Sequence, residues 1–206
     1  MQPPKVSDST ATLPIVRAGR PILRDPAALV SPDAIPSAEI QALIAQMVIA
    51  MRDAPGVGLA APQIDVGLRV IVIEDREALM SRLSPSELAA RGRVPVPLTV
   101  IFNPTLRRIG DERATFFEGC LSVPGYMALV ERDLEVEVTG LDARGAPLTW
   151  RARGWPARIL QHEVDHLDGT LYVDRMLTRS FFANDEVSER WLAMSADEIR
   201  AALRIE

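Results

Sequence analysis

The residues most able to do chemistry in this 206-residue chain are its two histidines, His162 and His166. Because residues four positions apart share one face of an α-helix, both imidazoles can bind the same metal ion. Glu163 follows the first histidine and can take a proton from a water molecule that the ion polarises. The pattern HEVDH therefore predicts a metal centre on a helix.

A catalytic centre of this kind needs a third protein ligand and one position left open for water. The candidates are Cys120, the single cysteine of the chain, and many carboxylates. Cys120 lies in the segment FEGCLS, where Gly119 allows close backbone approach and the apolar neighbours indicate a sheltered position. A lone cysteine is most often a small buried thiol. Beside a histidine pair that lacks a third histidine, however, Cys120 becomes the favoured ligand.

A third unusual segment, GVGLAAPQ, occupies residues 56–63. It has no Lys-Ser/Thr ending, as a phosphate-binding P-loop would, and it lacks the last glycine of a dinucleotide fingerprint. Its small residues permit tight backbone packing, and Gln63 offers a neutral amide donor. A plain turn between a helix and a strand explains the segment equally well.

Taken together, the segments GVGLAAPQ, EGCLS and QHEVDHLDG resemble, in this order, the three signature motifs of the peptide deformylases. The likeness extends from residues 19–21 to about Met176. Residues 154–158 and 178–181 are most similar to the mitochondrial and plant-organelle branch, which also occurs in some bacteria. The resemblance implies a hydrolase that removes the N-formyl group from the formylmethionine of nascent polypeptides and releases formate.

The resemblance also implies roles for individual residues. It assigns one divalent metal ion to three ligands, Cys120, His162 and His166. It makes Glu163 the group that moves the proton, and it makes the Leu121 backbone N–H and the Gln63 amide the donors to the formyl oxygen. The ion of the family is usually Fe(II), with zinc, nickel or cobalt as alternatives, and two imidazoles with one thiolate suit all of them.

A methionine side chain needs an apolar pocket in such an enzyme. The resemblance places five residues along it: Val57, Gly58, Phe116, Trp155 and Ile159. Many bacterial relatives have an arginine where this chain has Met127, so contacts with the peptide are expected to differ on that side. Arg132 lies five residues after Met127 in the sequence. It can form a buried pair with Asp165, which the sequence alone does not decide.

Two other interpretations remain open. In the first, the chain is an HExxH metalloprotease whose third ligand is Glu186, twenty residues after His166. That interpretation leaves Cys120 and Gln63 without roles. In the second, the chain is a non-catalytic protein that retains the fold. The presence of Glu163 disfavours it, because a purely structural metal site has no need of that acid.

Helices are predicted from apolar spacing and capping residues. They cover residues 38–53 with Ser37 as the cap, about 84–91, 155–167 with Gly169 at the end, and 185–205 with a break near Ser195. The central helix, 155–167, carries the HEVDH pattern and has apolar residues on more than one side, which is typical of a buried helix. Residues 76–97 are expected to form a surface excursion between two strands.

Strands are predicted where apolar residues alternate or cluster between turn residues. They cover residues 68–74, 100–102, 106–109, 126–130, 134–138, 148–153 and 171–173. This order predicts an α+β fold with antiparallel or mixed sheets packed around the central helix and a helix at the C-terminus. We expect a single domain over residues 1–206, with residues 1–12 as a loose arm.

Composition limits the partners. The chain is 48% hydrophobic and 25% charged, as globular domains are, and its formal net charge is −5. Direct DNA binding is not expected, because phosphate contacts need a basic face. Membrane insertion is not expected either, because no stretch approaches the roughly 18 apolar residues that a spanning helix needs. The expected partners are N-formylmethionyl nascent peptides, with at most transient contact with the ribosome.

The two ends of the chain bear on its location and its ribosome contact. The first residues lack the apolar region of a secretory signal and, with Lys5 and Asp8, match a transit peptide poorly. The bacterial cytoplasm is therefore expected in preference to an organelle. Residues 185–206 carry six acids and three arginines, which disfavours docking on the ribosome through a basic C-terminal helix.

Overall fold

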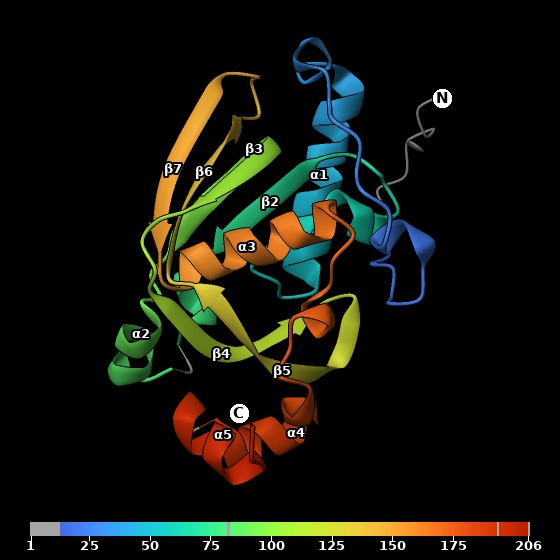
Figure 1. Cartoon of the computed structure of the whole chain (residues 1–206). Helices are drawn as coiled ribbons and strands as arrows, with labels where there is room; N and C mark the ends of the chain where they lie inside the picture. Colours follow the sequence, from blue (N-terminus) through green and yellow to red (C-terminus); the bar gives the residue numbers. More distant parts are fainter. Residues whose placement is uncertain (1–12, 82, 193, 206) are drawn as a thin grey trace.

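The computed structural model describes residues 13–81, 83–192 and 194–205. Two antiparallel sheets lie around helix α3 (Trp155–Leu167), which runs through the middle of the molecule (Figure 1). The predicted α+β class, with antiparallel sheets around the helix that carries HEVDH, is confirmed. The predicted loose arm, residues 1–12, lies outside the described residues.

The larger sheet has five strands in the order β1-β2-β3-β6-β7. These are β1 (Gly58–Ala60), β2 (Val70–Asp75), β3 (Val96–Arg108), β6 (Glu135–Leu141) and β7 (Pro147–Arg153). The two short strands predicted at 100–102 and 106–109 are one continuous strand, β3. Asn103 has a positive φ of 50°, and the register with β6 shifts between Phe102 and Thr105. This irregularity accommodates Pro104, which cannot donate a hydrogen bond to a neighbouring strand.

The smaller sheet has three strands in the order β4-β5-β8 and lies across α3 from the larger sheet (Figure 1). These are β4 (Arg113–Cys120), β5 (Val123–Asp133) and β8 (Phe182–Ala183). Strand β4, which the sequence analysis did not predict, pairs with β5 along nearly its whole length. Its last residue is Cys120, so this sheet carries the thiol towards α3.

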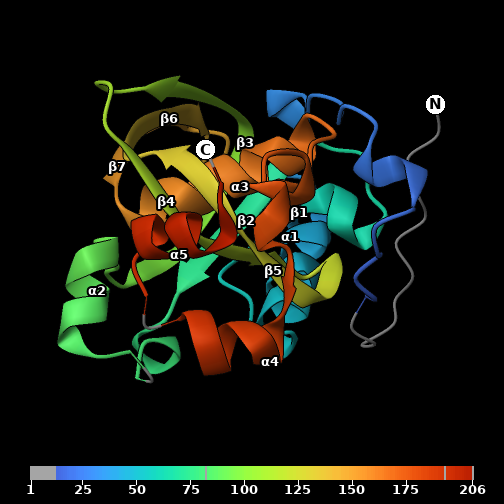
Figure 2. The same ribbon diagram turned by 60° about the horizontal axis from the view of Figure 1, so that its bottom comes forward.

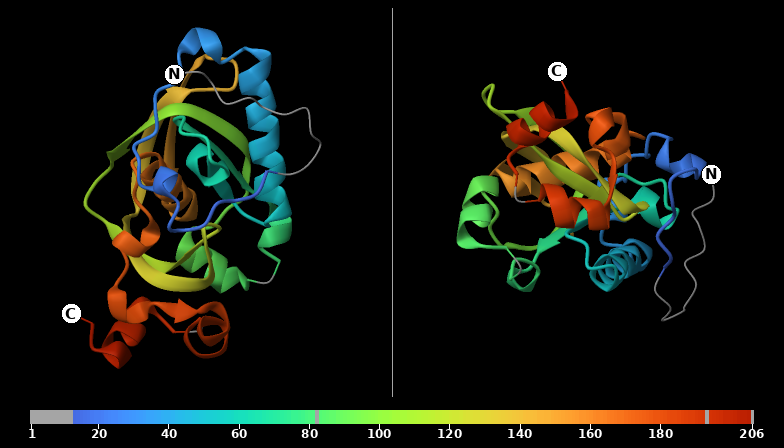
Figure 3. Two further views of the ribbon diagram at one scale, coloured as in Figure 1. Left: turned by 90° about the vertical axis from the view of Figure 1, so that its right-hand side faces the viewer. Right: turned by 90° about the horizontal axis from the view of Figure 1, so that it is seen from below.

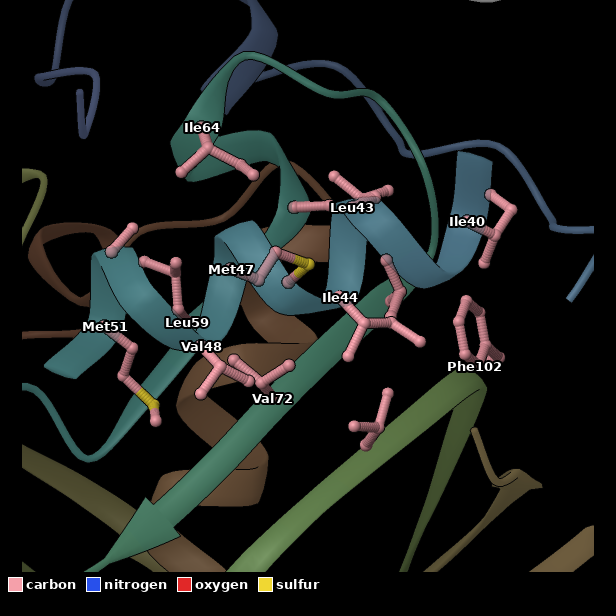
Figure 4. Packing of buried hydrophobic residues seen from close by; sticks show 14 of the residues in the cluster. Ile40, Leu43, Ile44, Met47, Val48, Met51, Leu59, Ile64, Val72 and Phe102 are labelled. Carbon is pink, nitrogen blue, oxygen red and sulfur yellow. The ribbon is translucent and has the colours of Figure 1, made fainter. Parts of the chain in front are cut away.

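Helix α1 (Ala38–Asp53) follows the predicted bounds, and Ser37 caps it by accepting a hydrogen bond from the Ile40 N–H. Its apolar face packs against β1 and β2 (Figure 4). The cluster includes Leu43, Met47 and Met51 from the helix. Burying side chains of this size stabilises the fold by about 1.5–3 kcal/mol each, before the cost of ordering the chain. This packing fixes the segment that follows α1, which contains the GVGLAAPQ motif.

Two glycines allow α3 to fit between its neighbours. Gly154, with φ 70°, precedes the helix, and a Cβ there would lie 2.7 Å from the Gly92 carbonyl oxygen. Gly169, with φ 73°, follows the helix, and its Cβ would lie 2.4 Å from the Arg24 carbonyl oxygen. Both positions combine a left-handed backbone with a close backbone contact, so only glycine fits. The predicted end of the helix at Gly169 is confirmed.

Residues 76–97 contain helix α2 (Pro85–Arg91), whose cap is Ser84 as predicted. The remaining short helices are 3₁₀ turns at Pro21–Leu23, Pro32–Ala34, Ala61–Ile64, Glu77–Leu79, Tyr172–Asp174 and Thr178–Ser180. The strand predicted at 171–173 is therefore wrong. Asp174 accepts a hydrogen bond from the Leu171 N–H and closes the 3₁₀ turn instead.

The C-terminal part forms a separate layer beneath β4 and β5 (Figures 2 and 3). It consists of α4 (Asn184–Glu186), a π-helical turn (Val187–Trp191) and α5 (Ala196–Leu203), which Ser195 caps. The predicted helical tail with a break near Ser195 is thus confirmed. Val187 and Ile199 are buried against Phe117 and Leu129 of the smaller sheet. Among the described helices, none is long and apolar enough to cross a membrane.

Candidate metal centre and active-site cleft

Helix α3 and strand β4 bring three metal-binding side chains together. His162 and His166 lie one helical turn apart on α3, and Cys120 ends β4. The Cys120 Sγ lies 3.3 Å from Nε2 of His166, although the two residues are 46 positions apart in the sequence. The ligand atoms of all three residues lie within 4.8 Å of one another.

This donor set fits a divalent ion such as iron or zinc. Bonds of about 2.0–2.3 Å to two imidazole nitrogens and one sulfur imply ligand atoms roughly 3.3–3.6 Å apart, so only small side-chain movements are needed. Nδ1 of His162 is bonded to Glu118, which leaves its Nε2 for an ion, and Nε2 of His166 already lies beside the thiol. Three ligands leave a fourth position for water.

Glu118 holds the first histidine in place. Its carboxylate accepts hydrogen bonds from Nδ1 of His162 at 3.0 Å and from Nε and Nη2 of Arg132 at 3.0 and 2.9 Å. Burial alone would raise the pKa of Glu118, but these hydrogen bonds from His162 and Arg132, with the charges of both groups, hold the pKa well below its usual range. The buried carboxylate therefore stays ionised and fixes the orientation of the ring.

The network continues from Glu118 through Arg132 to Asp165 of α3. Arg132 bonds Asp165 through Nη1 at 2.5 Å, so the pairing that the sequence left open is present. Arg175 adds two further bonds to Asp165 at 2.7 Å. Acids and arginines thus alternate from buried Glu118 to the exposed Arg175, so each of these charges has an opposite partner.

Glu163 is buried beside the candidate metal ligands, and its Oε2 has no hydrogen-bond partner among the described residues. Burial raises the pKa of its carboxyl to about 7. Its other oxygen, Oε1, lies against β1, where a Cβ on Gly58 would approach it to 2.3 Å. Gly58 therefore provides the space that the Glu163 carboxylate occupies. A carboxylate with a raised pKa and no ion-pair partner in the described part of the chain can accept and return a proton near neutral pH.

The amide of Gln63 is held in a single orientation. Its Oε1 accepts a hydrogen bond from the Ala60 N–H at 2.9 Å. Its Nε2 therefore faces the metal site, 3.6 Å from Sγ of Cys120 and 3.3 Å from Oγ of Ser122. Leu121 lies in the turn directly after Cys120. The GVGLAAPQ segment thus places an N–H donor beside the thiol.

These groups open into one cleft of about 730 Å³. The sequence-predicted residues that line it are Val57, Gly58, Gln63, Cys120, Leu121, Trp155, Ile159, His162 and Glu163. Two predicted residues do not line it. His166 lies behind the Cys120 thiol, and Phe116 packs edge-on against Trp155, with ring centroids 6.3 Å apart. The neighbouring Phe117 lines the cleft instead.

Two arginines that line the cleft were not identified in the sequence analysis. Arg91, the last residue of α2, lies with its guanidinium 5.5 Å from the Trp155 ring, and Arg93 lies 5.4 Å from the same ring. Arg93 is held by two hydrogen bonds to Asp75. The excursion at 76–97 therefore reaches the cleft, which its polar local sequence did not indicate. Glu118 was also missed, although it stands two residues before Cys120 and could have been considered as a partner for a ligand.

Comparison with known proteins agrees with this geometry. A sequence model of the family described as polypeptide deformylase matches residues 12–181. The chloroplastic peptide deformylase 1A of Solanum lycopersicum is 54% identical over 167 residues, which cover 81% of this chain and 60% of that protein. Peptide deformylase 3 of Streptomyces avermitilis is 47% identical over 196 residues, which cover 93% of this chain and 83% of that protein.

The fold is similar to that of a solved relative. The crystal structure of a class I type b peptide deformylase from Acinetobacter baumannii, with Met-Ala-Ser bound, superposes with a TM-score of 0.72 at 35% identity. The match covers 82% of this chain and all of that chain. The plant relative is longer, and the chain spans about three-fifths of its length. Because the family match covers residues 12–181, which include the whole larger sheet, β4, β5 and α3, the chain belongs to the polypeptide deformylase family.

Proposed function

We propose that this chain hydrolyses the N-formyl group of formylmethionine at the start of nascent polypeptides, producing formate and a free amino terminus. One observation supports the proposal most directly. The three candidate metal ligands, the buried Glu163 carboxylate and the Gln63 amide converge in one cleft. A hydrolase that attacks an amide carbonyl needs these components: an ion, a proton carrier and donors for the carbonyl oxygen.

The residues that would hold the ion are Cys120, His162 and His166. A divalent ion supplies a Lewis acid there and brings the pKa of a bound water molecule close to neutrality. We propose Fe(II) as the ion, with zinc, nickel or cobalt as alternatives that the same ligands accept. Metal analysis of protein purified without oxygen tests this choice, and we expect one equivalent of iron per chain.

Glu163 is the proposed proton carrier. Its carboxylate, which lines the cleft, takes a proton from the water molecule that attacks the formyl carbon. It then gives the proton to the nitrogen as the bond between carbon and nitrogen breaks. The fixed position of the carboxylate against Gly58 keeps it close to the ligands throughout.

The proposed donors stabilise the carbonyl oxygen as it becomes negatively charged. Nε2 of Gln63 already faces the site, because Ala60 fixes the opposite end of its amide. The backbone N–H of Leu121 is the second proposed donor, since this residue follows Cys120 directly. Losing one donor of this kind typically lowers turnover by about 10²–10³-fold.

The methionine side chain is proposed to lie along the apolar part of the cleft. Val57, Trp155 and Ile159 line that part, and Phe116 packs edge-on against the Trp155 ring. Apolar side chains at these positions favour an apolar, uncharged substrate side chain. Gly58 takes part by leaving room for the Glu163 carboxylate.

The proposed partners are formylated nascent peptides, met during transient contact with the ribosome. The excess of acids over arginines in residues 185–206 supports contact by some other surface than the C-terminal tail. We propose the bacterial cytoplasm as the location, and the long alignment with the Streptomyces avermitilis relative supports it. The single domain predicted over residues 1–206 also stays a proposal.

The experiment that tests the proposed function measures formate release from formyl-Met-Ala by the iron-loaded protein. We expect turnover by the wild type. For Glu163→Ala we expect unchanged metal content and turnover reduced by at least about 10²-fold, because the proton carrier is gone. Near-normal activity of this variant would contradict the mechanism, and no turnover by the wild type would favour a non-catalytic protein.

A metalloprotease is disfavoured by the position of Glu186. This residue is exposed and pairs with Arg190 at 2.9 Å, and it is not part of the metal-ligand group. The structure brings Cys120 to the histidines instead. Measuring the bound metal in Cys120→Ala and in Glu186→Ala separates the two functions. We expect metal loss in the first variant alone.

A further inference from the structure

Two residues that line the active-site cleft lie outside the part of the chain that the family match covers. The match ends at residue 181, whereas Asn184 and Leu192 line the cleft together with Cys120 and Glu163. Both belong to the C-terminal layer that lies beneath β4 and β5 (Figure 3). This wall of the cleft is therefore built by a segment that the family signature does not describe.

The π-helical turn directs Leu192 towards the cleft. The Leu192 N–H donates to the Val187 carbonyl five residues earlier, at 2.9 Å, where an α-helix would bond four residues back. The preceding Trp191 stacks on Phe182 with ring centroids 5.3 Å apart and packs into the C-terminal cluster. Leu192 takes no part in that cluster, and 38% of its surface remains exposed.

Two apolar residues of β5 line the same cleft. Tyr126 and Met127 pair with Ala183 and Phe182 of β8, so they adjoin the start of the C-terminal layer. The Tyr126 ring is 45% exposed and stacks on Phe181, with centroids 4.8 Å apart and an interplanar angle of 9°. This stacking limits the motion of the ring. The cleft thus has an apolar rim at which Tyr126 is held in place but exposed and Met127 is half-buried against the C-terminal cluster.

We infer that Leu192, with Tyr126 and Met127, forms an apolar subsite for a side chain that follows the formylmethionine in the substrate peptide. The inference rests on the proposed function and adds a preference to it. The occupant is the peptide, because the rim is continuous with the cleft that contains Cys120 and Glu163. An apolar side chain there covers exposed apolar surface, whereas a serine leaves that surface in water.

The test compares three substrates: formyl-Met-Ala-Ser, formyl-Met-Ala-Leu and formyl-Met-Leu-Ser. The quantity measured is the ratio of kcat/KM for each leucine peptide to kcat/KM for the serine peptide. In the wild type we expect at least one leucine peptide to be preferred. In Leu192→Ser we expect the kcat/KM ratio of that leucine peptide to fall about five- to tenfold, mainly through a higher KM. A loss of this size corresponds to partial burial of one leucine side chain.

Two variants control the experiment. Leu98→Ser removes a leucine of similar exposure, 42%, that does not line the cleft, and the ratio should stay at its wild-type value. Leu192→Met keeps the volume and apolar character of the side chain and should restore most of the preference. An unchanged ratio in Leu192→Ser, or an equal loss in Leu98→Ser, would overturn the inference.

The same experiment separates this inference from the proposed function. If the wild type released no formate from any of the three peptides, the proposed function would fail. The subsite would then be tested by calorimetric binding of Met-Ala-Leu, Met-Leu-Ser and Met-Ala-Ser to the wild type and Leu192→Ser. Tighter binding of a leucine peptide by the wild type alone supports the subsite, and equal binding in both proteins refutes it.

Discussion

Nδ1 of His162 donates a hydrogen bond of 3.0 Å to the carboxylate of Glu118. The two residues come from different elements, α3 and β4, and the same carboxylate is bonded to Arg132 and Arg158. One buried charge therefore links the sheet that carries Cys120 to the helix that carries both histidines. A ligand that is oriented in this way loses little freedom when it binds an ion, which favours tight binding.

Glu118→Gln should weaken metal binding. Glutamine keeps the shape of the side chain but removes the charge, so the His162 ring is held less firmly. Arg158 loses its carboxylate partner, whereas Arg132 retains Asp165. We expect the metal affinity to fall about 10–100-fold, measured by competition with a chelator. The matched control is Glu74→Gln, because Glu74 bonds Arg52 at 2.7 Å but is not among the cleft residues. Equal affinity in the wild type and Glu118→Gln would contradict the role of this carboxylate.

Gly58→Ala should impair turnover without removing the metal. The new Cβ would lie 2.3 Å from Oε1 of Glu163, so the carboxylate must leave its present position. We expect kcat to fall at least about tenfold, since displacing a catalytic group by about 1 Å can cost as much as 10²-fold in rate. Formate release and metal content should be measured on the same sample.

The control for this variant is Gly67→Ala. The nearest atom to a Cβ at Gly67 is 4.0 Å away, so the added methyl group is in ordinary contact. Its kcat should remain at the wild-type value. Normal turnover by Gly58→Ala would show that the Glu163 carboxylate tolerates another position.

The candidate metal site was only partly predictable from the sequence, because its residues are far apart along the chain. His162 and His166 could be paired because helical spacing is a local pattern. Cys120 stands 46 positions from His166, so a fold had to be assumed before the thiol could be placed. Leu192 was not predicted at all, because its direction depends on a π-helical turn that the local sequence does not mark.

The fold shows the same division between local and long-range information. Helix α1 and strand β7 were predicted because their capping residues and apolar spacing are local. Strand β4 was missed, since its side chains face α3 on one side and the C-terminal layer on the other and show no clear alternation. Leu171–Val173 looked like a strand from its apolar residues, but Asp174 closes a 3₁₀ turn there.

The Glu74–Arg52 pair should contribute to stability in a pH-dependent way. The hydrogen bond from Arg52 is the main cause that lowers the pKa of Glu74 below its usual value. The pair therefore stabilises the folded state fully above the pKa of the unfolded carboxyl, about 4.3, and this contribution is lost as pH falls through the lower folded value.

This dependence can be isolated by comparing urea unfolding of the wild type and Glu74→Gln. The difference in their free energy of unfolding should be constant from pH 7 to pH 5 and should shrink as the pH falls below 4. Glu39→Gln, on the exposed face of α1, serves as the control for the loss of one acid. A difference that grew on acidification would contradict the assigned direction of the pKa shift.

Ile199→Ala should loosen the C-terminal layer that carries Leu192. Ile199 is 1% exposed and packs in the cluster with Phe117 and Val187, so its truncation leaves a cavity. We expect the free energy of unfolding to fall by about 2–4 kcal/mol, measured with urea. Ile49→Ala removes the same atoms from a side chain that is 48% exposed on α1, and should cost less than about 1 kcal/mol. If both variants lost the same amount, the C-terminal layer would not be packed on the sheet as the structure shows.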